Sequence, residues 1–335
     1  MSRSLASAKP QAFLPFLVLT LVALTATAKV VFNTSSSSPI QVGKPSVLLI
    51  GDSIGYGHRD CTITSCQLEE NTFLSLYAFR GGANSIVNAA ISETSASNVN
   101  PDTMSGQARA QAGEFDDVTN TESIIEYGRN DINRGIASDT DFYEALMDIG
   151  NSLLSPGENI VERNNNLVFM TIPPMTPTSW ISAAGKRTAR PEYKEQIAST
   201  EYPIEYDSIF SARIWEAAQE LGADIVPVHE YFYFHPDDRY FSTDGIHPSS
   251  EGVKLLTWLF SFRGGVMQTD LNSIPLNSTI SATSNAHGFG MVVSKKDGQI
   301  IKAAPIEFYE NKSISFLKTD GDVTLFSSVP ISILN

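Results

Sequence analysis

The sequence has only two cysteines, Cys61 and Cys66, among 335 residues. Two cysteines are too few for a disulfide-stapled small fold or a four-cysteine zinc module, which excludes both classes. Basic residues are also scarce, with 23 lysines and arginines against 37 aspartates and glutamates, so the formal net charge is −14. A chain this acidic repels phosphate backbones and anionic lipid head groups. We therefore expect no nucleic-acid partner, and the 42% of hydrophobic residues indicates a globular protein.

Long apolar runs are missing except near the N-terminus, where one extends from Phe13 to Leu24 after Arg3 and Lys9. This run is shorter than the roughly 20 residues of a membrane-spanning helix. It is followed by small residues at 26–28, the kind of site that signal peptidases cut, so residues 1–28 are predicted to be a cleaved signal peptide. An uncleaved anchor is the alternative. Cleavage removes two cations, moves the net charge from −14 to −16, and leaves a secreted protein, extracellular or periplasmic, without a membrane contact.

Export also decides how the two cysteines are interpreted. Cys61 and Cys66 lie five residues apart in a polar stretch, and in an oxidising compartment such a pair is expected to close a small disulfide ring. Neither cysteine has the spacing of a metal ligand, and a free thiol is the alternative. His229 and His235 lie near acidic residues, but their spacing matches no familiar metal site. We therefore expect no metal and no other cofactor.

Residues 46–264 alternate between short apolar runs and stretches with helical spacing. The alternation predicts a doubly wound parallel sheet with right-handed crossovers. The polar residues at 29–45, which include proline and glycine, are predicted to be a linker. Strands are predicted at 47–50, 86–87, 123–127, 167–172 and 224–228, and helices at 70–79, from Asp139 or Thr140 as cap to 154, at 206–221 and at 249–262.

The helical spacing ends near Gly265. Beyond it the sequence has only short β-prone runs, at 291–293, 300–301, 306–309, 314–317 and 323–326. Asp297-Gly298 and Asp320-Gly321 are hairpin signals between two pairs of these runs. Residues 265–335 are therefore predicted to form a small all-β C-terminal domain. Its size is borderline for independent stability, so we expect it to pack on the main domain.

Residues with catalytic chemistry follow the predicted strands. Ser53 follows the first strand, Asn130 follows the third, and Asp244 and His247 stand just before the last helix. Because sites in open α/β sheets form at the carboxyl ends of the strands, one crevice is expected to collect these four side chains. His247 is the candidate base for Ser53, and Asp244 could accept the other ring proton. The Asn130 amide and the Ser53 backbone N–H are natural donors to an oxyanion.

Each motif alone has a structural interpretation. The sequence Gly-Asp-Ser can simply end a strand, Gly-x-Asn-Asp can be an Asx-turn, and Asp-x-x-His before proline can begin a capped helix. Only their combination, in this order after predicted strands, favours catalysis by a serine hydrolase.

The combined motifs resemble the GDSL, or SGNH, hydrolase superfamily over about residues 47–262. The first block is Gly51-Asp52-Ser53, the third is Gly128-Arg129-Asn130-Asp131 and the fifth is Asp244-Gly245-Ile246-His247. The resemblance implies a flavodoxin-like three-layer α/β/α sandwich and a Ser53–His247–Asp244 triad without a metal. It also implies an oxyanion hole made by the Ser53 amide, the Asn130 side chain and the amide of a second-block glycine. Members of the superfamily are esterases, lipases, thioesterases, carbohydrate O-deacetylases and O-acyltransferases.

The second block departs from the family pattern, because the expected glycine falls on Glu93. A glutamate keeps the backbone N–H, so Glu93 stays a candidate oxyanion donor through its backbone. Its carboxylate must then point away from the oxyanion, since like charges oppose each other. A rebuilt loop in which Ser92 supplies the donor is the alternative.

The sequence as a whole predicts a secreted serine esterase that removes small acyl groups such as acetyl from a saccharide. The substrate, a small molecule or a polysaccharide, is suggested by export, by the acidity of the chain and by the β domain, which could hold a carbohydrate. The alternatives are a lipase, a thioesterase or an O-acyltransferase of the same superfamily. An inactive surface-binding protein that uses residues 265–335 is the alternative from a different functional class.

Overall fold

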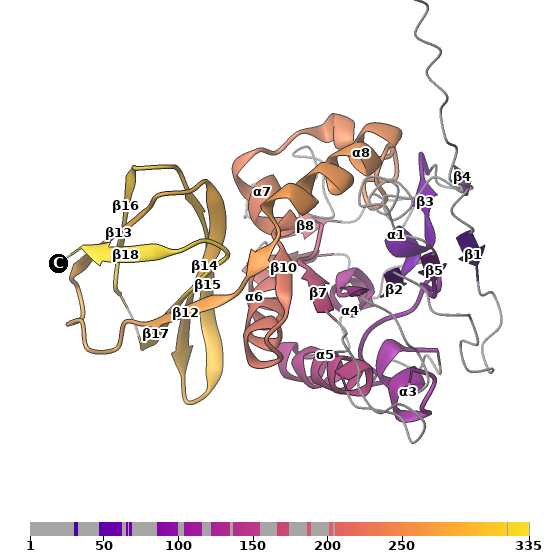
Figure 1. Cartoon of the computed structure of the whole chain (residues 1–335), viewed down its shortest axis with the longest axis horizontal. Helices are drawn as coiled ribbons and strands as arrows, with labels where there is room; N and C mark the ends of the chain where they lie inside the picture. The colour runs from indigo at the N-terminus through magenta and orange to yellow at the C-terminus, as the bar shows by residue number, and fades with distance from the viewer. Residues whose placement is uncertain are drawn as a thin grey trace, which may run out of the picture.

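Among the described residues, seven strands form one sheet in the computed structural model (Figure 1). Its order is β1-β5-β2-β6-β7-β10-β11, and every pairing is parallel except that of β10 with β11. Five of these strands, β5-β2-β6-β7-β10, have the 2-1-3-4-5 order of flavodoxin-like folds. The strands are β1 (Val30–Phe32), β2 (Val47–Gly51), β5 (Ile86–Asn88), β6 (Glu122–Glu126), β7 (Asn166–Met170), β10 (Asp224–Val226) and β11 (Gly264–Gly265).

The structure describes residues 30–32, 47–61, 65, 67–68, 86–99, 104–115, 122–134, 137–154, 166–173, 186–188, 201–203, 205–319 and 321–334. The predicted signal peptide at 1–28, the predicted helix at 70–79 and Cys66 lie outside them. In the described part of the chain, no helix has both the length and the apolar character needed to cross a membrane. The linker prediction is wrong at one point: Val30–Phe32 pair with Ile86–Asn88 as the edge strand β1, a partner that local composition does not reveal.

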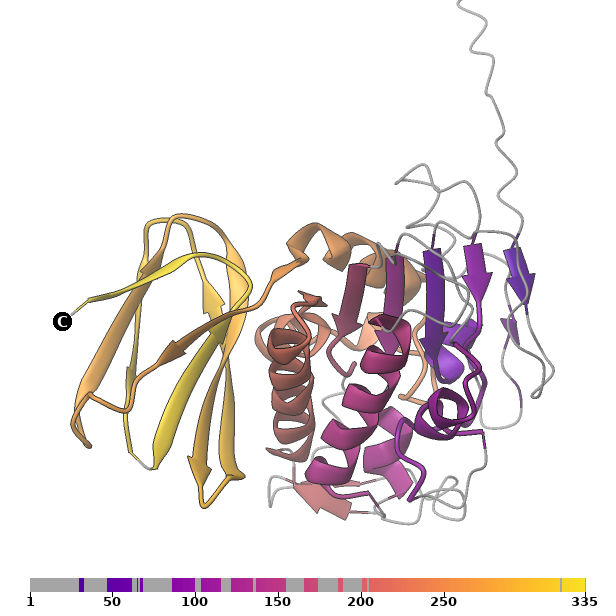
Figure 2. The same cartoon turned by 60° about the horizontal axis from the view of Figure 1, so that its bottom comes forward.

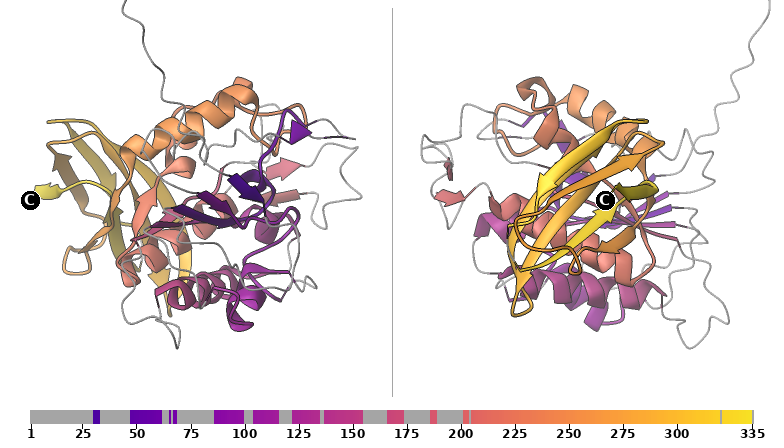
Figure 3. Two further views of the ribbon diagram at one scale, coloured as in Figure 1. Left: turned by 45° about the vertical axis from the view of Figure 1, so that its right-hand side comes forward. Right: turned by 90° about the vertical axis from the view of Figure 1, so that its left-hand side faces the viewer.

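Helices cover both faces of the sheet, because alternate side chains of its strands point to opposite sides (Figure 3, left). In β2, Leu48 and Ile50 pack in the cluster that contains α5 and α6, while Val47 and Leu49 pack in the cluster that contains α7 and α8. This three-layer arrangement confirms the predicted fold class. The helices are α1 (Ser53–Tyr56), α3 (Gly106–Gln111), α4 (Arg129–Arg134), α5 (Asp139–Leu154), α6 (Glu205–Glu220), α7 (Val228–Phe234) and α8 (Ser250–Leu259).

The helix ends match the sequence signals closely, with one exception. Neither Asp139 nor Thr140 caps α5. The cap is Ser138, whose Oγ accepts from the Asp141 N–H at 3.1 Å while Asp141 Oδ2 accepts from the Ser138 N–H at 2.9 Å. This reciprocal pair satisfies two backbone donors at once, which a single carboxylate one residue later would not do.

Two antiparallel sheets form the C-terminal domain, of which all residues but Asp320 are described up to 334 (Figure 3, right). One has the order β12-β17-β14-β15 and the other β16-β13-β18, so the predicted all-β domain is confirmed. The strands are β12 (Met267–Asp270), β13 (Thr279–Ser284), β14 (Gly288–Lys296), β15 (Gln299–Phe308), β16 (Ser313–Leu317), β17 (Asp322–Ser327) and β18 (Ile331–Leu334).

The two hairpin signals have different outcomes. Asp297 and Gly298 have φ angles of 51° and 80° and join β14 to β15, as predicted. The hairpin prediction at Asp320-Gly321 is wrong, because the flanking strands β16 and β17 belong to different sheets. A turn signal reports only that the chain can reverse locally; which strands then pair depends on the faces that they bury.

The C-terminal domain packs against α6 and α7 (Figure 2). Met291, Val293 and Ile300 join the same hydrophobic cluster as Trp215 of α6. A salt bridge of 2.6 Å between Lys295 Nζ and Glu216 Oε1 crosses the same contact. The two domains therefore share part of one core, as their sizes lead us to expect.

We predict that Met291→Ala lowers the free energy of unfolding by about 2–5 kcal/mol, because Met291 is fully buried in this shared core. Denaturant unfolding followed by fluorescence should show one transition that moves as a whole. The matched control is Leu276→Ala, at a side chain that is 58% exposed in the same domain, and it should change stability by less than about 0.5 kcal/mol. A second transition that moves while the first stays in place would contradict the shared core.

Candidate active site

The candidate nucleophile lies where a strand turns into a helix. β2 ends at Gly51, Asp52 caps α1 through its Oδ1, which accepts from the Ile54 N–H at 3.0 Å, and Ser53 is the first helical residue. Gly57 ends the helix after four residues with a φ of 107°. This short turn holds Ser53 at the carboxyl end of a central strand, where the sequence pattern places it.

Three of the predicted residues form one chain of hydrogen bonds. His247 Nε2 lies 2.8 Å from Ser53 Oγ, and His247 Nδ1 lies 2.6 Å from Asp244 Oδ2. Because a carboxylate only accepts, Nδ1 carries the proton and Nε2 is the acceptor that faces the serine. The other oxygen of Asp244 accepts from the backbone N–H groups of Ile246 and His247 at 2.9 and 3.1 Å, which fixes the carboxylate in place.

The nucleophile loop and the histidine loop are joined by several hydrogen bonds. The Cys61 carbonyl accepts from Thr243 Oγ1 at 3.0 Å and from the Asp244 N–H at 3.3 Å. Asp60 accepts from the Ser250 N–H at 3.0 Å and from Ser250 Oγ at 2.5 Å. These contacts hold the two loops at a fixed separation. Cys61 is fully buried, and its pairing with Cys66 stays a prediction because Cys66 lies outside the described residues.

Asn130 stands between the nucleophile turn and the second-block turn. Its Nδ2 donates to the Thr94 carbonyl at 2.7 Å and lies 3.4 Å from Asp52 Oδ2. The short bond fixes the plane of the amide, and the long one leaves the second hydrogen weakly held. Asn130 can therefore redirect that hydrogen to a charge that develops at Ser53.

Glu93 adopts the backbone conformation that a glycine would favour at its position. Its φ is 68°, in a turn closed by a 3.4 Å hydrogen bond from the Thr94 N–H to the Ile91 carbonyl. This left-handed conformation is the reason that glycine suits the position. Glu93 is exposed, so its carboxylate lies on the solvent side, the orientation that a backbone donor there requires.

His58 is a neighbour of the site that the sequence does not identify. Its ring centroid lies 5.4 Å from that of His247, and burial together with the charge of His247 lowers the pKa of His58 to about 4. His58 is thus neutral near pH 7. With Cys61 and His247 it presents potential metal ligands within 4.8 Å of one another. Both ring nitrogens of His247 already have partners, Ser53 Oγ and Asp244 Oδ2, so a metal there would have to break one of these contacts.

Three buried carboxyl groups lie beneath the site, and the sequence pattern does not reveal their grouping. Asp52, Glu126 and Asp131 are at most 2% exposed. Burial raises the pKa of Asp52 and of Asp131 to about 6 each, and raises the pKa of Glu126 well above its usual range. The available signal was Glu126 itself, a carboxylate directly after the apolar residues Ile124 and Ile125.

Arg129 of the third block does not face a substrate. Its guanidinium is buried, pairs with Asp207 at 3.2 Å and donates to the Pro173 carbonyl. It therefore ties α4 to α6 and to the end of β7.

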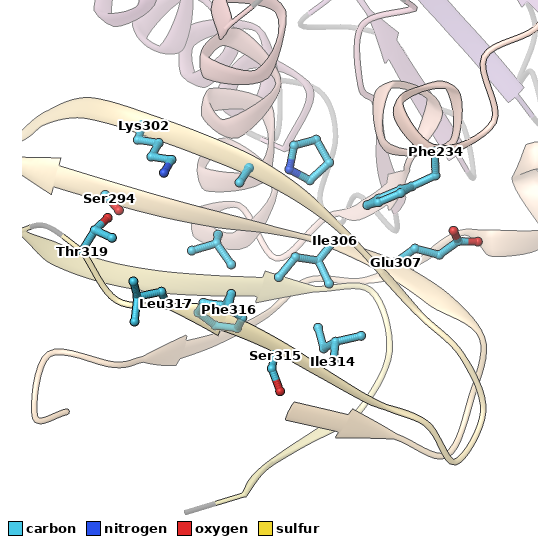
Figure 4. Close-up of a pocket in the computed structure, with 13 residues that line it drawn as sticks. Phe234, Ser294, Lys302, Ile306, Glu307, Ile314, Ser315, Phe316, Leu317 and Thr319 are labelled. Carbon is cyan, nitrogen blue, oxygen red and sulfur yellow. The ribbon is translucent and has the colours of Figure 1, made fainter. Parts of the chain in front are cut away.

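A separate cavity of about 410 Å³ lies in the C-terminal domain (Figure 4). It lies along the edge strands β15 and β16, and Phe234 of α7 closes one end. Most of its lining is apolar, including Ile306 and Phe316, with Lys302 at the rim. Ser53, Asn130, Asp244 and His247 are not among the residues that line it.

The family model of the GDSL-like lipase/acylhydrolase family matches residues 49–255. Similar solved structures include Est24, a carbohydrate acetylesterase from Sinorhizobium meliloti (19% identity, TM-score 0.48, 64% of this chain and 95% of that chain). A lipase/acylhydrolase from Enterococcus faecalis is 14% identical (TM-score 0.44, 64% and 92%). An aryl esterase from M. smegmatis is also 14% identical (TM-score 0.40, 64% and 98%). No curated protein sequence matches the chain significantly.

Another buried carboxyl, Glu230, lies outside the site. It accepts from Trp215 Nε1 and Thr171 Oγ1, each at 2.8 Å, and burial raises its pKa from 4.5 to about 7. Below pH 4.5 the group is protonated in both the folded and the unfolded chain. Between pH 4.5 and about 7 the unfolded chain releases this proton and the folded chain keeps it, so stability falls as the pH rises.

We predict that Glu230→Gln removes a loss of stability on the order of 3 kcal/mol between pH 4.5 and 8. The amide keeps both hydrogen-bond partners and does not titrate. Denaturant unfolding at several pH values measures the effect. The free energy of unfolding of the wild type should fall more steeply with rising pH than that of the variant. The same pH dependence in both proteins would contradict the raised pKa of Glu230.

Proposed function

The chain belongs to the GDSL-like lipase/acylhydrolase family, and from this premise we propose that it is a secreted serine esterase that removes small acyl groups, such as acetyl, from a saccharide. That it is a carboxylic ester hydrolase follows from the family. The observation that carries the catalytic assignment is the continuous hydrogen-bond chain from Ser53 Oγ through His247 to Asp244. An inactive binding protein would have no need for these three groups in hydrogen-bond contact.

In the proposed acylation step, Ser53 Oγ attacks the ester carbonyl carbon while its proton passes to His247 Nε2. The carbonyl π electrons move to the oxygen and form a tetrahedral oxyanion. Asp244 accepts the Nδ1 proton throughout and stabilises the imidazolium that results. His247 then gives its proton to the leaving alcohol oxygen as the carbon–oxygen bond breaks. An acyl-serine remains.

Water completes the reaction in the proposed second half. His247 Nε2 takes a proton from water as the water oxygen attacks the acyl carbon. The second tetrahedral oxyanion collapses, the bond to Ser53 Oγ breaks, and the serine recovers its proton from His247. The products are the free alcohol and the carboxylic acid, and the residues return to their starting protonation.

The oxyanion needs donors that are already in place before the reaction begins. We assign this role to the Ser53 backbone N–H, the Asn130 Nδ2 group and the Glu93 backbone N–H. The anchored plane of the Asn130 amide and the outward carboxylate of Glu93 support the assignment. Loss of one such donor typically lowers kcat by about 10²–10³-fold.

The charge of the chain and its predicted export support the choice of substrate. A mature chain near −16 repels anionic substrates and suits a neutral, hydroxyl-rich one. The predicted signal peptide would bring the enzyme to extracellular or periplasmic saccharides, and a Cys61–Cys66 disulfide would suit that compartment.

We predict that the mature protein hydrolyses p-nitrophenyl acetate and that Ser53→Ala lowers kcat by at least about 10³-fold, because the nucleophile is lost. Ser273→Ala, at an exposed serine in the C-terminal domain, is the matched control and should retain full activity. Acetate esters should have a higher kcat/KM than octanoate esters in the same assay. Equal activity of wild type and Ser53→Ala would overturn the catalytic assignment, and a preference for octanoate would overturn the small-acyl proposal.

A further inference from the structure

Glu126 lies directly beneath the nucleophile turn at the end of β6. Its Oε2 accepts from the backbone N–H of Gly55 at 3.0 Å and from that of Asp52 at 3.3 Å. Its own carbonyl also accepts from the Asp52 N–H, at 3.3 Å. One buried residue therefore holds the backbone on both sides of Ser53.

The two glycines of the Gly-Asp-Ser-Ile-Gly segment make room for this carboxyl. A Cβ on Gly51 would lie 2.7 Å from Glu126 Oε2 and 2.5 Å from the Glu126 carbonyl. A Cβ on Gly55 would lie 3.0 Å from the same Oε2. The turn is thus shaped around Glu126, and a larger residue at Gly51 would push the strand and the carboxyl apart.

The hydrogen bonds to the Glu126 and Asp52 carboxyl groups also leave the backbone N–H of Ser53 for the reaction. Asp52 and Gly55 donate to Glu126, and Ile54 donates to Asp52 Oδ1. For the Ser53 N–H, by contrast, no acceptor is found among the described residues. The turn therefore leaves the Ser53 N–H as a donor for the oxyanion.

Glu126 is also linked to the other oxyanion donor. Its carboxyl hydrogen-bonds to that of Asp52, whose Oδ2 lies 3.4 Å from Asn130 Nδ2. Besides Glu126, the charged or titratable groups near Asp52 are His247, Arg129, Tyr127 and Asp131. Two carboxyl groups can hydrogen-bond only when one of them carries a proton, and burial together with the charge of Asp52 raises the pKa of Glu126 well above its usual range.

We propose that Glu126, in its protonated form, is a positioning residue of this esterase that aims the Ser53 N–H and keeps a second negative charge away from the oxyanion. As an acceptor it fixes the backbone around Ser53. As a donor to Asp52 it weakens the pull of that carboxylate on the Asn130 hydrogen. The inference depends on the proposed serine mechanism.

The test compares Glu126→Gln, Glu126→Leu and the wild type in p-nitrophenyl acetate hydrolysis between pH 6 and 10. Glutamine reproduces the protonated carboxyl, with an oxygen for the two N–H groups and an amide hydrogen for Asp52. Leucine has a similar size and lacks both functions. Glu230→Gln is the matched control, since it neutralises a buried carboxyl in a separate network.

We expect Glu126→Leu to lower kcat by about 10²-fold, as misplacement of reacting groups typically does, with KM changed less than about threefold. Glu126→Gln should keep kcat within about threefold of the wild type at pH 7. At alkaline pH the wild type should lose kcat as Glu126 ionises, whereas Glu126→Gln should not. Glu230→Gln should follow the wild-type profile.

A nearly unchanged kcat in Glu126→Leu, or an equal loss of kcat in both Glu126 variants, would overturn the proposal. So would the same dependence of kcat on alkaline pH in Glu126→Gln and in the wild type. If Glu126→Leu shows no cooperative thermal unfolding, the proposal is judged by the dependence of kcat on alkaline pH in Glu126→Gln and in the wild type. Ser53→Ala distinguishes a failure of the proposed function from a failure of the positioning role of Glu126. If it is as active as the wild type, the proposed function fails; if it is inactive, the Glu126 results bear on the positioning role alone.

Discussion

The parallel pairing of β2 with β6 is the constraint on which the site depends. It sets Gly51 opposite Glu126, so the two strands end side by side and the residues after them, Ser53 and Asn130, lie at the same edge of the sheet. Hydrogen bonds to Cys61 and Asp60 help to hold the loop before α8, in which His247 Nε2 lies 2.8 Å from Ser53 Oγ. A slip of one residue between β2 and β6 would turn every side chain of one strand to the opposite face.

The same pairing buries charge, and the fold has to offset that cost. Asp52, Glu126 and Asp131 lie almost without solvent contact beneath the crevice, where an ionised carboxylate is unfavourable. Backbone N–H groups at the start of α1 and in the 96–97 loop satisfy their oxygens. The large apolar clusters on both sheet faces, one of them extended by the C-terminal domain, supply the compensating stability. The polar base of the site is thus stable only because the whole sandwich surrounds it.

The sequence allowed the main strands of the sheet and the proposed triad to be predicted because both depend on simple rules. Buried strands appear as apolar runs such as 47–50, and catalytic side chains follow their carboxyl ends. The features that were mispredicted or missed are of two kinds. In some, several neighbouring residues could play the same local role, and in others the partner lies far away in the sequence. Ser138 was a better cap than Asp139 or Thr140 only through its reciprocal bond with Asp141. The chain passes from β16 to β17 in another sheet, and the positions of His58 and Glu126 beside the site arise from contacts with segments far away in the sequence.

The central claim is that Ser53 is activated by His247 within a preformed hydrogen-bond chain. Reaction of the full-length mature protein with a fluorophosphonate, followed by peptide mass spectrometry, tests this claim most directly. The account predicts that the label is found on Ser53 and that His247→Ala abolishes labelling while the protein still unfolds cooperatively. Labelling of a different serine, or labelling of Ser53 that does not depend on His247, would contradict it.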